Sequence, residues 1–477
     1  MTSYGKPRTI DFLKLILRAQ LYTLLLLPLL LTAADKPTNP SVCADCIRKN
    51  LDYLAGPDLH GRGSGTEDEF RAAQYIAAQL KSYGLKPAAE NGQYIQVGAI
   101  SSRKVTGTPV ITFEKDSHTV TLTQGKEVAL ISATQPDLTA PLQKLDLGDP
   151  SVSPASVKPG AAVVLKFKPD AGAQNMESVL GAYMRSSAAI VLFPVPADGQ
   201  KMFQRMSQRG PRPEKKIADE PQRPDGGLIT SDSATQLWSL AEGTSIKLHA
   251  DVTPWETTHT WNVLAKIDGK KNQQQIILLS AHLDHLGVRD GKMYPGADDD
   301  ASGTVAVMEL ARALAGEKRP QRTVVVALFG SEEAGLVGSR YFLKHPTFPL
   351  KNIVANLNFE MIGRADAKVK PNELWLTGWE RTNLGPELAA HGAQLVGDPH
   401  PDQGFFARSD NYSLARDGII AQSVSSYGLH TDYHQPTDTI DKIDWQHLDS
   451  AIGSMIGPVS WLANSDFTPQ WSPGGKP

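Results

Sequence analysis

Cysteine is almost absent from this 477-residue chain, and the two that occur, Cys43 and Cys46, are spaced C-x-x-C. Two thiolates cannot complete the four-ligand set of a structural zinc site. A redox motif of this spacing needs a strand, a turn and a helix around it, and that context is missing. We therefore expect a small local disulfide formed in an oxidising compartment, without a catalytic role.

Long hydrophobic runs are also missing. The apolar run from Leu21 to Leu31 is shorter than the roughly 20 residues that a membrane span needs. Basic residues precede it and small residues follow it, which is the order of a secretory signal. We expect residues 1–34 to be a cleaved signal peptide, and the mature protein to be periplasmic or extracellular with no stable membrane span. Membrane anchoring through an uncleaved N-terminal segment is the alternative.

A strong excess of either charge is missing too. The formal net charge is -3, so nothing in the composition indicates a nucleic acid partner. Hydrophobic residues make up 40% of the chain, enough for a sizeable core. At roughly 150 residues a domain, the length predicts two or three domains.

Residues 251–465 alternate apolar strands with helical patterns. Ile276–Ser280 and Thr323–Phe329 are continuous apolar runs, typical of strands buried on both faces. A helix pattern at Ser302–Leu314 lies between them. This alternation predicts an α/β fold with a mixed, mainly parallel central sheet flanked by helices. Residues 40–105, which begin with helical patterns, are expected to complete the same discontinuous domain.

Residues 106–250 have a different character. They contain short strand-like runs such as Val110–Phe113 and Val163–Phe167, together with a polar excursion at 197–227. None of the polar clusters described below falls in this block, so we expect an inserted β-rich domain. Residues 466–477 are rich in Pro, Gly and Ser, and predict a flexible tail.

Polar clusters follow three of the apolar strands, at the point where each strand ends. The pairs of strand and cluster are Ile276–Ser280 with His282-Leu283-Asp284-His285, Thr323–Phe329 with Ser331-Glu332-Glu333, and Ile353–Phe359 with Glu360. Ligands of open α/β sheets bind beyond the carboxyl ends of strands. Carboxylates that converge there repel one another unless a cation neutralises them, so the sequence predicts a metal site.

The ligand types narrow the choice of metal and of roles. Imidazole and carboxylate without thiolate favour zinc in a catalytic site, although manganese or cobalt could also be accepted. His282 and Asp284 project to the same side of an extended segment, so we expect His282 on the metal and Asp284 fixing its ring. Of Glu332 and Glu333, one can bind metal while the other takes a proton from the attacking water. A solvated helix N-terminus is the alternative for this pair.

Two further clusters leave alternatives open. The three adjacent aspartates at 298–300 are either a source of ligands or an N-terminal helix cap. His434 is a candidate ligand with Asp438 as its orienting partner, although that turn could equally cap a helix. His430 competes for the same role.

Together these motifs resemble the co-catalytic dizinc aminopeptidase family, which includes glutamate carboxypeptidase II and, as a non-catalytic relative, the transferrin receptor. The resemblance covers most of residues 47–100 and 260–460. It depends on five motifs in family-like order, which are His282-Leu283-Asp284, Asp299-Asp300-Ala301-Ser302-Gly303, Glu332-Glu333-Ala334-Gly335-Leu336, Asn358-Phe359-Glu360-Met361-Ile362-Gly363 and Tyr433-His434 followed by Asp438. The block at 106–250 resembles the protease-associated domain often inserted in this family.

The resemblance implies two Zn2+ per chain and a role for each motif. The implied ligands are His282, Asp299 and Glu360 for one zinc, and Asp299, Glu333 and His434 for the other. Glu332 matches the general base, and Asp284 matches the aspartate that supports the first histidine. Tyr433 resembles a tyrosine that stabilises the oxyanion, with plain packing as the alternative. Many members have Asp where this chain has Glu360, so metal spacing or preference is expected to differ.

The implied activity is that of a secreted metallo-exopeptidase acting on peptides, with an aminopeptidase as the first interpretation. A carboxypeptidase or dipeptidase is the second, and Arg408 is its candidate carboxylate anchor. A single-zinc glutaminyl cyclase and a non-catalytic receptor-like protein are less favoured, because all five ligands and Glu332 are present. The preferred residue and the oligomeric state are not predicted.

Overall fold

The computed structural model describes residues 1–2, 41–167, 179–196 and 199–477. The expected signal peptide, apart from its first two positions, lies outside the described residues. Residues 42–477 form one structural unit. Within the described part of the chain, no helix combines the length and the apolarity needed to cross a membrane.

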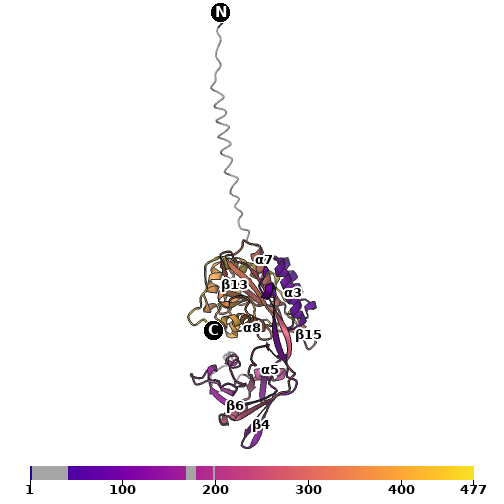
Figure 1. Ribbon diagram of the computed structural model, residues 1–477, viewed down its shortest axis with the longest axis vertical. Helices are drawn as coiled ribbons and strands as arrows, with labels where there is room; N and C mark the ends of the chain where they lie inside the picture. The colour runs from indigo at the N-terminus through magenta and orange to yellow at the C-terminus, as the bar shows by residue number, and fades with distance from the viewer. Residues whose placement is uncertain (3–40, 168–178, 197–198) are drawn as a thin grey trace. The chain divides into compact units, whose positions relative to one another are not determined.

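A ten-stranded mixed sheet is the centre of this unit, as Figure 1 shows. Its strand order is β19-β18-β20-β17-β13-β16-β12-β2-β9, and β1 pairs with β12 off this path. The four strands β20, β17, β13 and β16 run parallel, whereas β12 runs antiparallel to both of its neighbours, β16 and β2. The bounds are β1 Lys86–Pro87, β2 Ile95–Arg103, β9 Glu214–Ile217, β12 Glu256–Ile267, β13 Asn272–His282, β16 Arg322–Phe329, β17 Ile353–Phe359, β18 Leu374–Leu376, β19 Leu395–Gly397 and β20 Ala421–Ser425. The predicted mixed α/β fold is confirmed.

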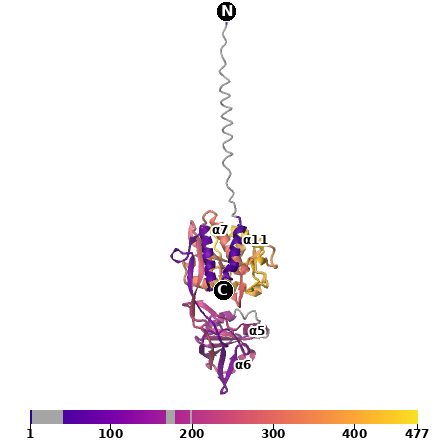
Figure 2. The same ribbon diagram turned by 90° about the vertical axis from the view of Figure 1, so that its right-hand side faces the viewer.

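Helices cover both faces of this sheet. One face packs against α2 (Ala44–Leu54), α3 (Glu67–Ser82), α7 (Gly303–Ala315) and α11 (Trp445–Asn464); Figure 2 shows α7 and α11 on the same side. The other face packs against α8 (Val337–Lys344) and α10 (Asn411–Arg416). The short helix α9 spans Leu384–Ala390.

Helices on both faces explain why the central strands carry apolar side chains on both sides. Along β13, Ile277 and Leu279 face the large helical layer, whereas Ile276 and Leu278 face the layer that contains Phe342. Successive side chains of a strand point to opposite faces, so a strand covered on both sides reads as a near-continuous apolar run. All eight residues of β16 are accordingly buried.

An eight-stranded sheet forms most of the block that was expected to be an insert. Its strand order is β4-β3-β11-β6-β7-β8-β10-β5. The bounds are β3 Val110–Lys115, β4 His118–Thr123, β5 Val128–Ser132, β6 Asp137–Asp146, β7 Ala162–Lys166, β8 Ile190–Pro194, β10 Asp225–Ile229 and β11 Ser245–His249, with helices α5 Gln200–Arg209 and α6 Ser231–Ser239. Separate apolar clusters lie on its two faces.

One strand of the block leaves it and joins the large sheet. Strand β9 (Glu214–Ile217) pairs antiparallel with Ile100–Arg103 of β2. Ile217 packs there with Ile100 and Val337. The predicted insert at 106–250 is therefore not a wholly separate element, and its polar excursion contains a strand of the large sheet.

The C-terminal residues differ from the expected flexible tail. Trp471 pairs with Thr382 in an isolated bridge, and its indole donates to the Gly418 carbonyl at 3.3 Å. Arg322 donates to the Phe467 carbonyl at 2.7 Å. Composition alone emphasised Pro, Gly and Ser, whereas the aromatic side chains of Phe467 and Trp471 anchor the segment on the large sheet's core. The local disulfide between Cys43 and Cys46 is confirmed.

Asp225 connects β10 to the chain that follows β5, and this contact can be tested. Its buried carboxylate accepts from the backbone N–H groups of Thr134 and Gln135 and from the Ser132 and Thr134 hydroxyls. Asp225→Asn places an amide NH2 against these donors, so we expect about 1–3 kcal/mol less stability in urea unfolding. The exposed Asp232→Asn on α6 is the matched control. Equal stability of the two variants would contradict this role for Asp225.

Candidate active site

Every residue expected in the site lies at the carboxyl edge of the parallel strands or on a loop beside it. His282 is the last residue of β13, Glu332 and Glu333 follow β16, and Glu360 directly follows β17. Asp299 belongs to the irregular helical turn Ala297–Ser302 that leads into α7. His434 and Tyr433 lie on the loop beyond β20.

Asp299 lies between two groups of side chains. Its Oδ1 is 3.2 Å from Nε2 of His282, which is also 3.4 Å from Oε1 of Glu360. Its Oδ2 is 3.1 Å from Nε2 of His434, which is also 3.1 Å from Oε1 of Glu333. The structure thus brings together all five expected ligands, in the two sets that the family resemblance implies.

The charges of the second set are strongly coupled. Burial alone would raise the pKa of Asp299, but His285, His282 and His434 hold it well below its usual range. Burial and Asp299 also act to raise the pKa of Glu333, yet His285 and His434 lower it to about 2. Burial would lower the pKa of His434, whereas Asp299 and Glu333 raise it to about 10. The histidines and the carboxylates of this set therefore stabilise each other's charges.

Several buried oxygen and nitrogen atoms of the site have no hydrogen-bond partner. They are Oδ2 of Asp299, Oε1 of Glu333 and both ring nitrogens of His285. Buried polar atoms are otherwise almost always satisfied, so atoms left in this way indicate a ligand. Imidazole nitrogen and carboxylate oxygen are the donors that catalytic zinc uses, so these residues fit such an ion.

His285 is the site residue that sequence reasoning left without a role. It is fully buried, and its Nδ1 lies 3.0 Å from Oε1 of Glu333 and 3.8 Å from Oδ2 of Asp299. Together with Asp299 and Glu333 it forms one of two groups in the described residues able to hold a metal ion. Its position directly after the His-Leu-Asp motif was the only signal in the sequence.

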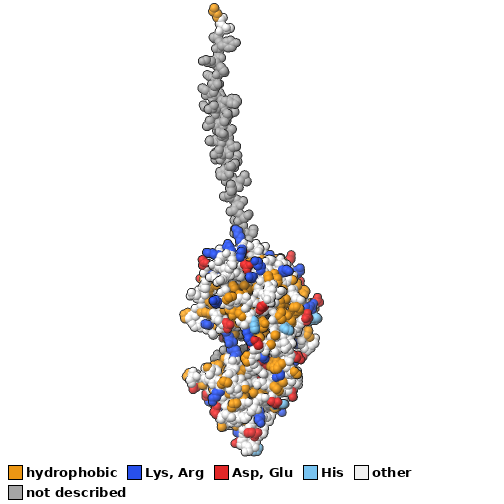
Figure 3. All heavy atoms as spheres, in the orientation of Figure 1, with side chains coloured by type: hydrophobic (Ala, Val, Ile, Leu, Met, Phe, Trp, Pro, Cys, Tyr) orange, Lys and Arg blue, Asp and Glu red, His pale blue; other side chains and the backbone are white. Residues whose placement is uncertain are grey.

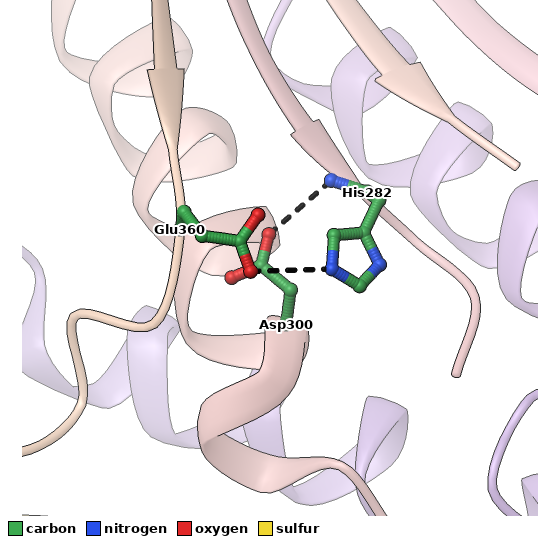
Figure 4. A group of neighbouring side chains, drawn as sticks. All are labelled: His282, Asp300 and Glu360. Atoms are coloured by element: carbon green, nitrogen blue, oxygen red, sulfur yellow. Dashed lines mark hydrogen bonds and ion pairs between the residues drawn. The ribbon is translucent and has the colours of Figure 1, made fainter. Parts of the chain in front are cut away.

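The three adjacent aspartates separate into different roles. Asp300 lies near His282 and Glu360, as Figure 4 shows, but its carboxylate accepts from the backbone N–H groups of His282, Met361 and Gly303. Asp298 accepts from the backbone N–H of Gly363 and from the Ser302 hydroxyl. Asp299 alone of the three lies within ion-pair distance of the histidines at 282 and 434.

The contact between Asp284 and the His282 ring differs from the expected one. Nδ1 of His282 is 3.0 Å from the backbone carbonyl of Asp284 and 3.7 Å from its carboxylate. The carboxylate instead accepts from the backbone N–H of Glu332 at 2.9 Å and from the Ser64 hydroxyl at 2.5 Å. The main chain of Asp284 therefore orients the ring, and its side chain positions the glutamate loop.

Asp438 was a candidate for orienting His434, with a helix cap as the alternative, and its carboxylate contacts main-chain N–H groups instead of that ring. Its carboxylate accepts from the backbone N–H groups of Asp298 and Asp299, which are 3.0 and 3.1 Å away. The side chain therefore stabilises the turn that carries Asp299. His430, the competing candidate, has its Nε2 at 2.9 Å from Asp298 and lies outside both ligand sets.

Tyr433 and Arg408 lie beside the second ligand set. The Tyr433 ring stacks on His434 with centroids 3.9 Å apart, and its hydroxyl is 3.5 Å from Nη2 of Arg408. Burial, Asp299 and Glu333 raise the pKa of Tyr433 far above its usual range, so the hydroxyl keeps its proton. It is therefore available as a hydrogen-bond donor.

An aromatic pocket adjoins Glu360. Its lining residues are Glu360, Met361, Trp375, Thr377, Phe405, Arg408, Ser409, Ser423, Ser425, Tyr427 and Tyr433. Trp375 stacks on Phe405 with ring centroids 5.3 Å apart, and Phe405 meets Tyr427 edge to face. Ser409 donates to Glu360 at 2.5 Å and so ties this ligand to the pocket wall. The pocket is small, with a volume of about 40 Å³, and lies next to Glu360.

Comparison with known proteins agrees with this geometry. Residues 262–456, which contain both ligand sets, match peptidase family M28. The expected resemblance to zinc aminopeptidases is confirmed.

Several named relatives of the M28 region are peptidases. Leucine aminopeptidase 2 of Trichophyton rubrum is 29% identical over 217 residues, covering 44% of this chain and 41% of that protein. An aminopeptidase of Pseudomonas aeruginosa is 38% identical over 127 residues, covering 26% of this chain and 22% of that protein. The chain thus matches less than half the length of these curated relatives.

A solved structure supports the fold over a longer stretch. The aminopeptidase from Aneurinibacillus sp. strain AM-1 is similar with a TM-score of 0.54 at 20% identity. The match covers 91% of this chain and 96% of that one. The mixed α/β architecture is therefore shared along most of the molecule.

The contact of Asp284 with the glutamate loop predicts a catalytic defect without unfolding. In Asp284→Asn, an amide NH2 faces a donor at Glu332 N–H or Ser64, and the loop shifts. We expect peptide hydrolysis to fall about 10- to 100-fold, while the protein loses about 1–3 kcal/mol of stability and remains folded at the assay temperature. The exposed Asp58→Asn is the matched control. Full activity of Asp284→Asn would contradict the positioning role.

The two ligand sets predict a metal content that elemental analysis can measure. Freshly purified protein should contain close to two zinc ions per chain, and His282→Ala or His434→Ala should each lower this toward one. His118→Ala, an exposed histidine on β4, should leave it unchanged. A content of one ion in the unaltered protein would instead favour the single-zinc, cyclase-like interpretation.

Proposed function

We propose that this protein is a secreted two-zinc exopeptidase that releases N-terminal residues from peptides. The observation that carries the proposal is the placement of Asp299, whose two oxygens face His282 with Glu360 on one side and His434 with Glu333 on the other. His282, Asp299 and Glu360 would hold one zinc, and Asp299, Glu333 and His434 would hold the other. Manganese or cobalt could replace zinc at the same donors.

Zinc bound at these residues would polarise the scissile carbonyl and acidify the attacking water. Glu332 is proposed to take the proton from that water. Burial raises the pKa of its carboxyl well above the usual range, and Glu333 and Asp410 add to the effect. A carboxylate of raised pKa holds a proton long enough to pass it to the leaving amine. The hydrogen bond from its backbone N–H to Asp284 keeps Glu332 in place.

Tyr433 is proposed to donate its hydroxyl proton in a hydrogen bond to the developing oxyanion. Its raised pKa keeps it neutral, and its stacking on His434 places it beside the second ligand set. Such donors stabilise charge that appears only in the transition state. Simple packing of the ring against His434 is the alternative role.

The aromatic pocket supports an aminopeptidase with a preference for an apolar first residue. It lies against Glu360, whose carboxylate could pair with the free amine of a substrate whose first side chain fills the pocket. Arg408 lines the same pocket and favours the second candidate, a carboxypeptidase or dipeptidase that anchors a terminal carboxylate there. The signal-like N-terminus supports export, and the β-rich block is proposed to be protease-associated-like.

Turnover by a Glu332→Gln variant tests the general base. Glutamine keeps the size of the side chain but cannot accept the proton, so we expect kcat to fall on the order of 100- to 10,000-fold. The zinc content should remain that of the unaltered protein. Normal turnover with full metal content would exclude Glu332 from proton transfer.

A panel of paired peptides decides between the two exopeptidase interpretations. Each peptide is supplied with a free amine and in an N-acetylated form, and with a free or amidated C-terminus. Cleavage that is abolished by acetylation and survives amidation identifies an aminopeptidase. Cleavage that survives acetylation and is abolished by amidation identifies a carboxypeptidase.

A further inference from the structure

A second, basic cavity lies next to the loop that carries Glu332 and Glu333. We call it the arginine cleft, defined by Arg185, Arg212, Arg223, Arg340 and Arg416. Its volume is about 740 Å³, and its wall includes residues of α8 and α10 of the large domain together with residues from the β-rich block. Figure 3 shows Lys and Arg side chains beside a hollow on the face that it displays.

The charges that line the cleft are unbalanced. Besides the five arginines, Lys215 and Lys344 line it, whereas its acidic lining residues are Glu214, Glu220 and Asp417. Arg340 is paired with Glu220, and Lys344 with Asp219 at 2.6 Å. The positive charges therefore exceed the negative charges available to pair with them.

Four of the five arginines have no ion-pair partner. Across the described part of the chain, an ion pair forms at Arg340 but at none of the guanidinium groups of Arg185, Arg212, Arg223 and Arg416. Burial and the charges of Arg416 and Arg223 lower the pKa of Arg185, and burial and Arg416 lower that of Arg340 to about 10. Like charges gathered in this way oppose folding, and such costs are kept mainly at functional sites.

The segment that follows Glu332 and Glu333 connects the cleft to the proposed reaction centre. Ala334, Gly335 and Leu336, which directly follow the two glutamates, line it. Nη1 of Arg340 donates to the Gly335 carbonyl at 2.9 Å, which holds this guanidinium close to the glutamate loop. Ala407 lines the cleft and its neighbour Arg408 lines the aromatic pocket, so the two cavities flank the same segment.

We propose that the arginine cleft binds a carboxylate on the part of the substrate beyond the scissile bond. This rests on the proposed function, in which the first side chain fills the aromatic pocket and the remaining peptide leaves by another route. An extended peptide advances about 3.3 Å per residue, so a few residues carry it past Gly335 into the cleft. Guanidinium groups bind carboxylates with paired hydrogen bonds. The carboxylate is either an acidic side chain or the free C-terminus.

Matched tetrapeptides test the proposal and separate the two sources of carboxylate. All begin with the same apolar residue, which is the type that the aromatic pocket is proposed to accept, and continue Ala-Ala. They end in Glu-amide, in Gln-amide or in Gln with a free carboxylate. For the peptide whose carboxylate the cleft accepts, we expect kcat/KM to be about tenfold higher than for the Gln-amide peptide, because KM is lower. The advantage should shrink as salt is raised, because added ions screen exposed charges.

The variant for this test is the double substitution Arg185→Gln with Arg416→Gln, since neither arginine has an ion-pair partner to strand. The ratio of kcat/KM for acidic over neutral peptide should fall to near one. Lys247→Gln, an exposed lysine on β11, is the matched control and should keep the ratio. Equal rates for all three peptides, or a ratio that survives the double substitution, would overturn the proposal.

Direct binding separates this inference from the proposed function. Calorimetry with the Glu332→Gln protein should give a lower Kd for an acidic tetrapeptide than for the neutral one. The difference should vanish in the variant that combines Glu332→Gln with Arg185→Gln and Arg416→Gln. If no peptide is hydrolysed but acidic peptides bind preferentially, the proposed function fails and the cleft stands. If peptides are hydrolysed without any preference in rate or binding, the cleft proposal alone fails.

Discussion

The repulsion among carboxylates gathered at one sheet edge is the constraint on which this site depends. Asp299, Glu332, Glu333 and Glu360 come from separate strands and loops, yet they meet within a buried space. Three imidazoles offset part of this charge, and Asp299 is the side chain that both groups share. A bound cation pair would relieve the remaining repulsion and would make the same residues catalytic.

A layer of acidic residues behind the ligands holds the loops in place through backbone contacts. Asp284 fixes the glutamate loop, Asp300 joins three loops, and Asp438 supports the turn of Asp299. Each carboxylate accepts from main-chain N–H groups that would otherwise be buried without partners. The ligand geometry therefore depends on residues that never need to touch a metal.

The sequence predicted the strands and the residues at their ends better than it predicted contacts between side chains. Continuous apolar runs placed β13 and β16 correctly, because a strand covered on both faces is apolar along most of its length. Asp284 was expected to fix the ring of His282, and Asp438 was a candidate to orient His434, whereas both carboxylates accept from backbone N–H groups. Spacing along a chain shows which residues share a segment, but not which donor each carboxylate meets after the loops close. The same limit left His285 without a role.

Strand β9 gives the β-rich block a mechanical link to the catalytic sheet. Its pairing with Ile100–Arg103 covers the outer edge of β2, whose backbone N–H and C=O groups would otherwise be open. An uncovered edge of this kind recruits strands from other molecules. Excising residues 106–250 to obtain a smaller enzyme would therefore create an aggregation-prone border. A shortened protein would have to retain Glu214–Ile217, or replace them with a strand that closes the edge.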